Sequence, residues 1–167
     1  MAKRTQAKLL KKLQYRYGKM AAKMEEYYHQ LDFRGLDDFD DDGFAYLMEK
    51  VKGIEMLDLN ETDISNDSIQ LLIRLEYVKE IRAKGCQNLD NDCIPYLSQL
   101  PSLEFLHLKY TQVTIDGLLQ LIGLPNLKTL MFSAEEGEDI RGKLLQLHAK
   151  FPDCELVVDG KVQHFDK

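Results

Sequence analysis

Apolar and polar positions follow a pattern that repeats along most of the chain. Four nine-residue segments align without gaps at intervals of 24 or 25 residues: FDDDGFAYL from Phe39, ISNDSIQLL from Ile64, LDNDCIPYL from Leu89 and VTIDGLLQL from Val113. Each segment has apolar residues at its first, sixth and ninth positions and an aspartate at its fourth. This spacing predicts a short helix with one apolar face in every repeat.

A second pattern precedes each of these segments and also follows the last one. It places apolar residues at the first, fourth and sixth positions, in the sets Tyr28/Leu31/Phe33, Ile54/Leu57/Leu59, Val78/Ile81/Ala83, Leu103/Leu106/Leu108 and Leu127/Leu130/Phe132. Alternation of this kind predicts a short strand with one buried face. Strands that alternate with helices at a fixed interval predict a parallel sheet.

Small and acidic residues recur at fixed places in the repeat. We predict that Asp42, Asp67, Asp92 and Asp116 cap the helix N-termini, because a carboxylate there accepts free backbone N–H groups. Cys86 falls where other repeats have Thr62 or Thr111, and Cys93 falls where they have Gly43, Ser68 or Gly117. We therefore expect both cysteines to fill structural positions, and three cysteines without zinc-site spacing favour a reducing compartment.

The LxxLxL pattern and its interval resemble the leucine-rich repeat family across about residues 28–158, and the cysteine at the turn resembles the ribonuclease-inhibitor-like subclass. This resemblance implies an α/β solenoid with a short curved parallel sheet on the concave face and helices on the convex face. The stretches VKEIRAKGCQNLDNDCIPYLSQLPSLE, GLLQLIGLPNLKTL and FPDCELVV are also similar to the family of mitochondrial ATP synthase coupling factor B and a distal membrane-arm assembly factor. That similarity implies a non-catalytic adaptor in complex assembly.

Three regions are expected along the chain. Residues 1–27 should form a basic amphipathic capping helix, residues 28–153 about five repeats, and residues 154–167 a capping strand or hairpin that turns at Asp159-Gly160. The apolar stripe of the first region consists of Leu10, Leu13, Tyr17, Met20, Met24 and Tyr27. A partner helix, a self-pairing helix and a mitochondrial presequence are the alternatives for this region.

Charge is distributed unevenly over the 167 residues, which carry a net charge of -6. Residues 1–24 hold eight basic and no acidic side chains, so the remainder holds 14 basic and 28 acidic ones, a net charge of -14. A basic end on an acidic body argues against nucleic-acid binding. With no apolar run long enough for a membrane span, we expect a cytoplasmic monomer or weak dimer, with the matrix side of mitochondria as the alternative location.

One segment matches the EF-hand calcium motif. The match, from Asp38 to Glu49, involves Asp38, Asp40, Asp42, Gly43 and Glu49. The repeat already accounts for Asp42-Gly43 and makes Phe44 to Glu49 helical, whereas a calcium site requires a loop. We therefore expect no cofactor and no metal, and keep the carboxylates Asp38, Asp40, Asp42 and Glu49 only as the alternative cation cluster.

The outward side chains of the predicted strands form the candidate binding site. In the absence of a nucleophile, phosphate-loop or zinc-ligand motif, we expect no enzyme but a module that binds another protein, with a basic protein as one candidate. The alternatives are a bacterial immunity or inhibitor protein that blocks a toxin or effector, and a mitochondrial respiratory-complex assembly adaptor. The candidate contact residues are Asp32, Arg34, Met56, Asp58, Asn60, Arg82, Lys84, Phe105, His107, Lys109, Tyr110 and Met131.

Overall fold

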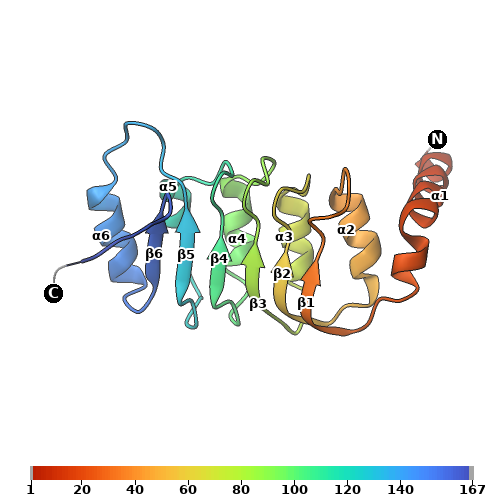
Figure 1. The fold of residues 1–167 in the computed structure, drawn as a ribbon, viewed down its shortest axis with the longest axis horizontal. Helices are drawn as coiled ribbons and strands as arrows, with labels where there is room; N and C mark the ends of the chain where they lie inside the picture. Colours follow the sequence, from red (N-terminus) through yellow and green to blue (C-terminus); the bar gives the residue numbers. More distant parts are fainter. Residues whose placement is uncertain (1, 166–167) are drawn as a thin grey trace.

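The computed structural model describes residues 2–165, which are organised around one seven-stranded sheet. Its strands are β1 (Tyr27–Asp32), β2 (Gly53–Asp58), β3 (Tyr77–Arg82), β4 (Phe105–His107), β5 (Thr129–Phe132), β6 (Glu155–Val158) and β7 (Lys161–Val162). They lie in the order of the sequence, as Figure 1 shows. β1 to β6 are parallel, and β7 is antiparallel to β6.

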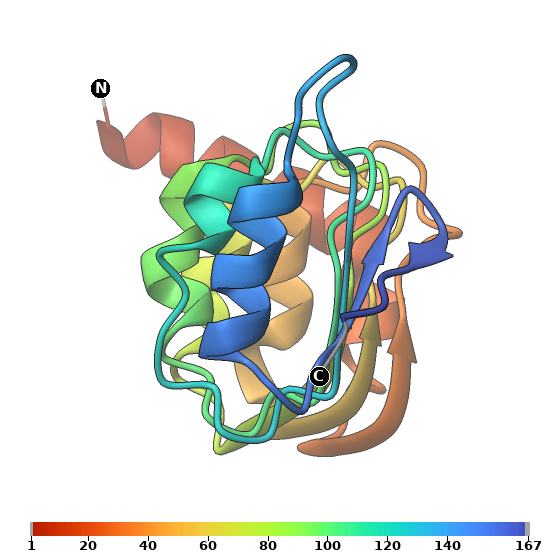
Figure 2. The same cartoon turned by 90° about the vertical axis from the view of Figure 1, so that its left-hand side faces the viewer.

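The helices form a layer on one face of this sheet. They are α1 (Ala2–Ala21), α2 (Asp41–Leu47), α3 (Asn66–Leu72), α4 (Ile94–Leu97), α5 (Ile115–Leu118) and α6 (Arg141–Lys150), with short 3-10 turns η1 (Met48–Lys50) and η2 (Asn91–Cys93). Figure 2 shows α2 to α6 stacked on one side of the sheet, while the other side carries no helix. The expectation of an α/β fold with a mostly parallel sheet is therefore confirmed.

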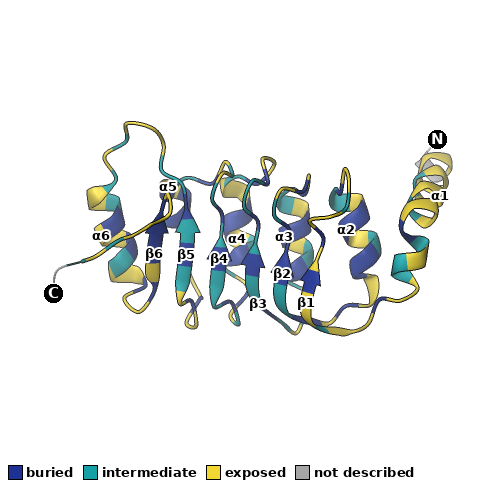
Figure 3. Cartoon of the chain, viewed as in Figure 1, coloured by how far each residue is buried: buried dark blue, intermediate teal, exposed yellow. Residues whose placement is uncertain are grey.

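The core lies between the sheet and the helix layer (Figure 3). All the apolar strand positions predicted from the sequence are buried except Tyr28, which is half-buried. From the opposite side they meet the sixth positions of the helical segments, which are also buried: Phe44, Ile69, Ile94 and Leu118. The two sequence patterns thus mark the two walls of one continuous core.

The helix caps lie two residues earlier than predicted. The N-cap residues are Asp40, Ser65, Asp90 and Thr114, whose side chains accept backbone N–H groups of the first turn at 2.9 to 3.3 Å. The apolar residue before each cap explains this position, because it packs against the residue five places later, as Phe39 does against Phe44. The prediction for Asp42, Asp67, Asp92 and Asp116 as caps is therefore wrong; they occupy the first turn instead.

The residue after each of the first three caps links one repeat to the next. Its side-chain oxygen accepts the backbone N–H group of the following repeat's cap residue. The three links are Asp41 to Ser65 at 2.8 Å, Asn66 to Asp90 at 3.2 Å and Asn91 to Thr114 at 2.9 Å. Consecutive helix N-termini are therefore held together by a polar ladder that the sequence analysis did not predict.

The N-terminal helix is shorter than expected. α1 ends at Ala21 rather than near residue 27, and Tyr27 already begins β1. The carbonyl of Glu26 accepts the N–H groups of Lys52 and Gly53, which brings the chain into register with β2. Tyr17 is 4% exposed but Leu10 is 54% exposed, so the apolar stripe packs against the repeats from Leu13 to Met24. Residue 1 of the predicted helical region lies outside the described residues.

The C-terminal end closes with the predicted hairpin. Asp159 and Gly160 have φ values of 50° and 83°, and Val157 pairs with Val162 across the turn. Two consecutive positive φ values are typical of the tight turn that joins antiparallel strands. Residues 166–167 of this region lie outside the described part. Among residues 2–165, no helix has the length and apolar character needed to cross a membrane.

Candidate functional site

The candidate contact residues lie together on the uncovered side of the sheet. Register pairs each member of the first two columns with the next, and the third column consists of the residues two places further along each chain segment, so the columns run across the strands. We define the open sheet face as Tyr110 and three columns: Gln30, Met56, Glu80, Phe105 and Thr129; Asp32, Asp58, Arg82, His107 and Met131; and Arg34, Asn60, Lys84, Lys109 and Ser133. The structure therefore brings all twelve candidates onto one surface.

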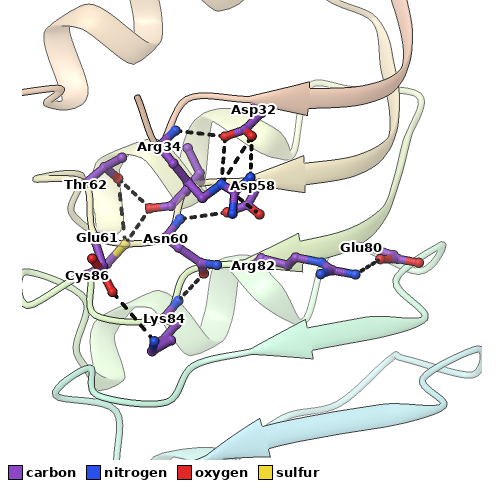
Figure 4. Close-up of polar contacts among 11 residues, drawn as sticks. Asp32, Arg34, Asp58, Asn60, Glu61, Thr62, Glu80, Arg82, Lys84 and Cys86 are labelled. Carbon is purple, nitrogen blue, oxygen red and sulfur yellow. Dashed lines mark hydrogen bonds and ion pairs between the residues drawn. The ribbon is translucent and has the colours of Figure 1, made fainter. Parts of the chain in front are cut away.

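The acidic end of this face is paired internally. The guanidinium of Arg34 donates to Asp32 from Nε at 3.0 Å and from Nη2 at 2.7 Å, and it lies 3.4 Å from Asp58. The hydrogen bonds from Arg34 lower the pKa of Asp32. Figure 4 shows Arg34 beside both carboxylates. Asp58 is only 3% exposed. One arginine thus offsets part of the negative charge of the two carboxylates.

Asn60 makes hydrogen bonds within the open sheet face. Its N–H group donates to Asp58 at 3.0 Å, and its side-chain oxygen accepts the N–H group of Lys84 at 2.8 Å. Figure 4 shows this link between neighbouring repeats. Because both contacts are internal, Asn60 contributes shape to the surface rather than free hydrogen-bonding groups.

The centre of the face is basic. Arg82 pairs with Glu80 at 3.2 Å and Lys84 pairs with Glu61 at 3.6 Å. Among residues 2–165, Lys109 has no carboxylate within ion-pair distance, and its Nζ lies 4.7 Å from the ring centre of Tyr110. The centre therefore presents cations whose compensation is incomplete.

His107 lies among these cations. Its pKa is lowered from the usual 6.5, first by burial and then by Lys84, Arg82 and Lys109. The side chain is consequently neutral at pH 7. Within the described residues, His107 Nε2 and Arg82 Nε are buried without a hydrogen-bond partner. The two residues are direct neighbours in the register of β3 and β4.

Large side chains complete the site. Met56, Phe105 and Met131 are half-buried, and Tyr110 is 53% exposed. The guanidinium carbon of Arg82 lies 5.1 Å from the ring centre of Phe105, a cation–π distance. Tyr110 also has a backbone φ of 60°, in the left-handed region that favours glycine.

The cysteines occupy buried positions, as expected from their place in the repeat. Cys86 Sγ donates to the carbonyl of Leu59 at 3.0 Å, and Thr62, its equivalent, donates to the same carbonyl at 2.8 Å. Burial raises the pKa of Cys86 and raises the pKa values of Cys93 and Cys154 to about 12. All three therefore remain protonated thiols at neutral pH, and a thiol is a poor nucleophile.

The segment with the calcium motif is helical from Asp41 to Leu47 and continues as a 3-10 turn. Asp40 is used as a cap, and Asp38 lies 3.8 Å from Arg16. Asp42 and Glu49 are exposed. In the part of the chain that the structure describes, no group of three or more His, Cys, Asp or Glu side chains is placed to hold a metal ion.

A hollow on the helix side was not predicted. It measures about 580 Å³ and lies between α4 and α5, with Ile94, Pro95, Gln99 and Ile122 among its lining residues. Asp116 at its edge is paired with Lys143 at 2.8 Å. Most of its lining surface is apolar, and the polar residues Asn91 and Ser98 at its wall hydrogen-bond to the next repeat. We therefore consider the open sheet face the stronger candidate for a binding site.

The chain was compared with protein-family models and with known proteins, and it is similar to one group of the latter. No protein-family model matches the chain, so the resemblance to leucine-rich repeats stays a prediction. The chain is 30% identical over 120 residues to proteins named ATP synthase subunit s, mitochondrial, from Pongo abelii and Homo sapiens, and 29% identical to that of Bos taurus. The alignments cover 68% of this chain, which spans only 60% of the length of these relatives. They support the weaker of the two resemblances, to a mitochondrial ATP synthase factor.

Proposed function

We propose that the chain is a leucine-rich-repeat solenoid that binds a partner protein through the open sheet face and performs no catalysis. The in-order parallel strands, the recurring caps and the ladder between repeats support the solenoid assignment. In such a stack each repeat contacts its neighbours, and the sheet provides an extended binding surface.

The observation that carries this proposal is the set of large side chains on the open sheet face. Met56, Phe105, Tyr110 and Met131 lie outside the core between the sheet and the helices. Methionine, aromatic and arginine side chains are enriched at protein interfaces, and aromatic residues are frequent centres of binding energy. The left-handed backbone of Tyr110 belongs to the repeat, because Glu61 and Gly85 have positive φ values at the equivalent turn positions.

The relatives favour one biological setting among the alternatives. Their names describe a subunit of a mitochondrial ATP synthase. We therefore propose a mitochondrial adaptor of energy-converting complexes, in preference to a cytoplasmic module. The inhibitor alternative rests on size and on a pI of about 5.2, and no relative supports it.

An affinity-capture experiment in the source organism tests this function. The bait is the tagged chain, compared with a Phe105→Asp/His107→Asp variant and with Leu145→Asp, whose leucine is 59% exposed on the helix side. We expect wild type and Leu145→Asp to retain the same partner, including subunits of an energy-converting complex, and the double variant to lose it. Equal retention by all three folded baits would contradict binding through the open sheet face.

A further inference from the structure

The ion pairs on the open sheet face differ in hydrogen bonding and in exposure to solvent. Arg34 holds Asp32 in two hydrogen bonds and lies beside the buried Asp58. Near the central cations, Glu80 accepts a hydrogen bond from Arg82 at 3.2 Å. Glu61 is held less firmly, because its side chain is 72% exposed and lies 3.6 Å from Lys84, and Lys109 has no carboxylate within ion-pair distance among the described residues. An exposed pair of this kind contributes little and exchanges readily. The face is therefore electropositive at its centre, although the whole chain carries a net charge of -6.

The central cations surround one point rather than forming a line. Arg82, Lys84 and Lys109 each act on the imidazole of His107, which pairs with Arg82 in the second column. Arg82 Nε and His107 Nε2 are buried and have no hydrogen-bond partner among residues 2–165. The donors within reach of a partner are therefore the other N–H groups of Arg82 and the ammonium groups of Lys84 and Lys109, whose side chains are partly exposed.

Aromatic rings border this point on two sides. The ring of Phe105 lies 6.4 Å from the imidazole of His107, edge to face. Lys84 and Lys109 lie 6.0 and 4.7 Å from the ring centre of Tyr110. Apolar walls around fixed cations lower the local dielectric and strengthen charge-assisted hydrogen bonds.

We propose that the centre of the open sheet face is an anchoring site for a carboxylate side chain of the partner, held by Arg82, Lys84 and Lys109 around His107. This inference rests on the proposed function and names the chemistry of its contact. The site lies in the middle of the sheet, with Asp32 and Asp58 on one side and Met131 on the other. A partner segment can thus continue in both directions, which favours an internal Asp or Glu over a chain terminus.

The neighbouring strands add selectivity to this anchor. Asp58, one strand away from Arg82 in the same column, is a buried carboxyl group beside Arg34, so it disfavours a second carboxylate placed there. On the other side, Met131 pairs with His107 in the register and offers apolar contact. The partner sequence that fits best therefore has one acidic residue with an apolar residue on one side and a neutral or basic residue on the other.

A titration with a small probe tests the anchor without the partner. The ¹⁵N-labelled chain is titrated at constant ionic strength with glutarate and, as a neutral control of the same shape, with glutaramide. We expect glutarate to give saturable shifts at the imidazole nitrogens of His107 and at Lys109, and to raise the pKa of His107. Glutaramide should give none.

Two variants locate this binding. Lys109→Gln should weaken glutarate binding about 10-fold or more, the effect of removing one charge-assisted hydrogen bond. Lys128→Gln removes the same charge from an exposed position outside the three columns, where Lys128 pairs with Glu104. It should leave the titration unchanged. Absence of saturable shifts, or equal weakening by both variants, would overturn the anchor.

Affinity measurements with the captured partner distinguish a failure of this inference from a failure of the proposed function. If Lys109→Gln loses affinity for the partner while Lys128→Gln keeps it, the anchor is supported. If the partner is lost with Phe105→Asp/His107→Asp but binds Lys109→Gln and Arg82→Gln as tightly as wild type, the open sheet face binds the partner without a carboxylate anchor. In that case the function stands and this inference is wrong.

Discussion

Gly117 makes a contact that leaves no room for a side chain. A Cβ atom at this position would lie 2.1 Å from Asn91 Oδ1 and 2.5 Å from Asn91 Cγ. Asn91 occupies this place because its Oδ1 accepts the N–H group of Thr114 at 2.9 Å, while its Nδ2 donates to the Thr114 hydroxyl at 3.0 Å. Alanine at position 117 would therefore force Asn91 to turn away and lose both hydrogen bonds.

The expected magnitude follows from these contacts. Losing the two hydrogen bonds costs about 2 kcal/mol, and replacing a helical glycine by alanine regains up to about 1 kcal/mol. Gly117→Ala should thus lower the free energy of unfolding by about 1 kcal/mol. In an Asn91→Gly background the obstructing side chain is absent. There, Gly117→Ala should raise the free energy of unfolding by up to about 1 kcal/mol.

Urea denaturation followed by circular dichroism measures all four proteins of this double-mutant cycle. The account predicts that Gly117→Ala changes sign between the two backgrounds, with a coupling free energy of about 2 kcal/mol. If Gly117→Ala destabilises both backgrounds equally, the contact with Asn91 is not the reason for glycine. The ladder between repeats would then contribute little to stability.

Three further predictions concern buried or paired groups. Asp41→Ala should lower the free energy of unfolding by about 2 kcal/mol, because Asp41 accepts hydrogen bonds from Ser65 and Ser68; Asp42→Ala, at an exposed first-turn position, should cost well under half of that in the same urea assay. Cys93, whose pKa burial raises to about 12, should resist iodoacetamide at pH 8 in the folded chain and react after unfolding, as mass spectrometry would show; labelling at the rate of a free thiol would refute its burial. The pKa of His107 is lowered from 6.5 by burial and neighbouring cations, so the unfolded chain binds its proton first and stability falls as the pH drops below 6.5. His107→Gln should flatten that slope between pH 7.5 and 5, and an unchanged slope would contradict the assignment.

The strand and helix pattern was predictable because it depends on local periodicity. The buried sets such as Ile54, Leu57 and Leu59 follow directly from the spacing of apolar residues. The columns of the open sheet face follow from the same spacing, since parallel strands in equivalent repeats pair in equivalent register. The hairpin at Asp159-Gly160 was also predictable, because its turn requires two residues that tolerate positive φ.

The polar contacts were not predictable in the same way, because they join residues one repeat apart. The cap at Asp40 depends on how Phe39 packs against Phe44, and the link from Asn91 to Thr114 depends on how two helices stack. The open sheet face shows the same limit. The sequence predicts that Asp32 and Asp58 lie on this face, but only the structure shows that Arg34 lies within ion-pair distance of both.

Site-specific photo-crosslinking tests the central claim, binding through the open sheet face, most directly. p-Benzoylphenylalanine replaces Tyr110, which is 53% exposed on that face, or Leu145, which is 59% exposed on the helix side. The two proteins are irradiated in cells of the source organism, and the adducts are identified by mass spectrometry. The account predicts one dominant protein adduct from position 110 that position 145 does not give. An adduct from position 145 alone would contradict it.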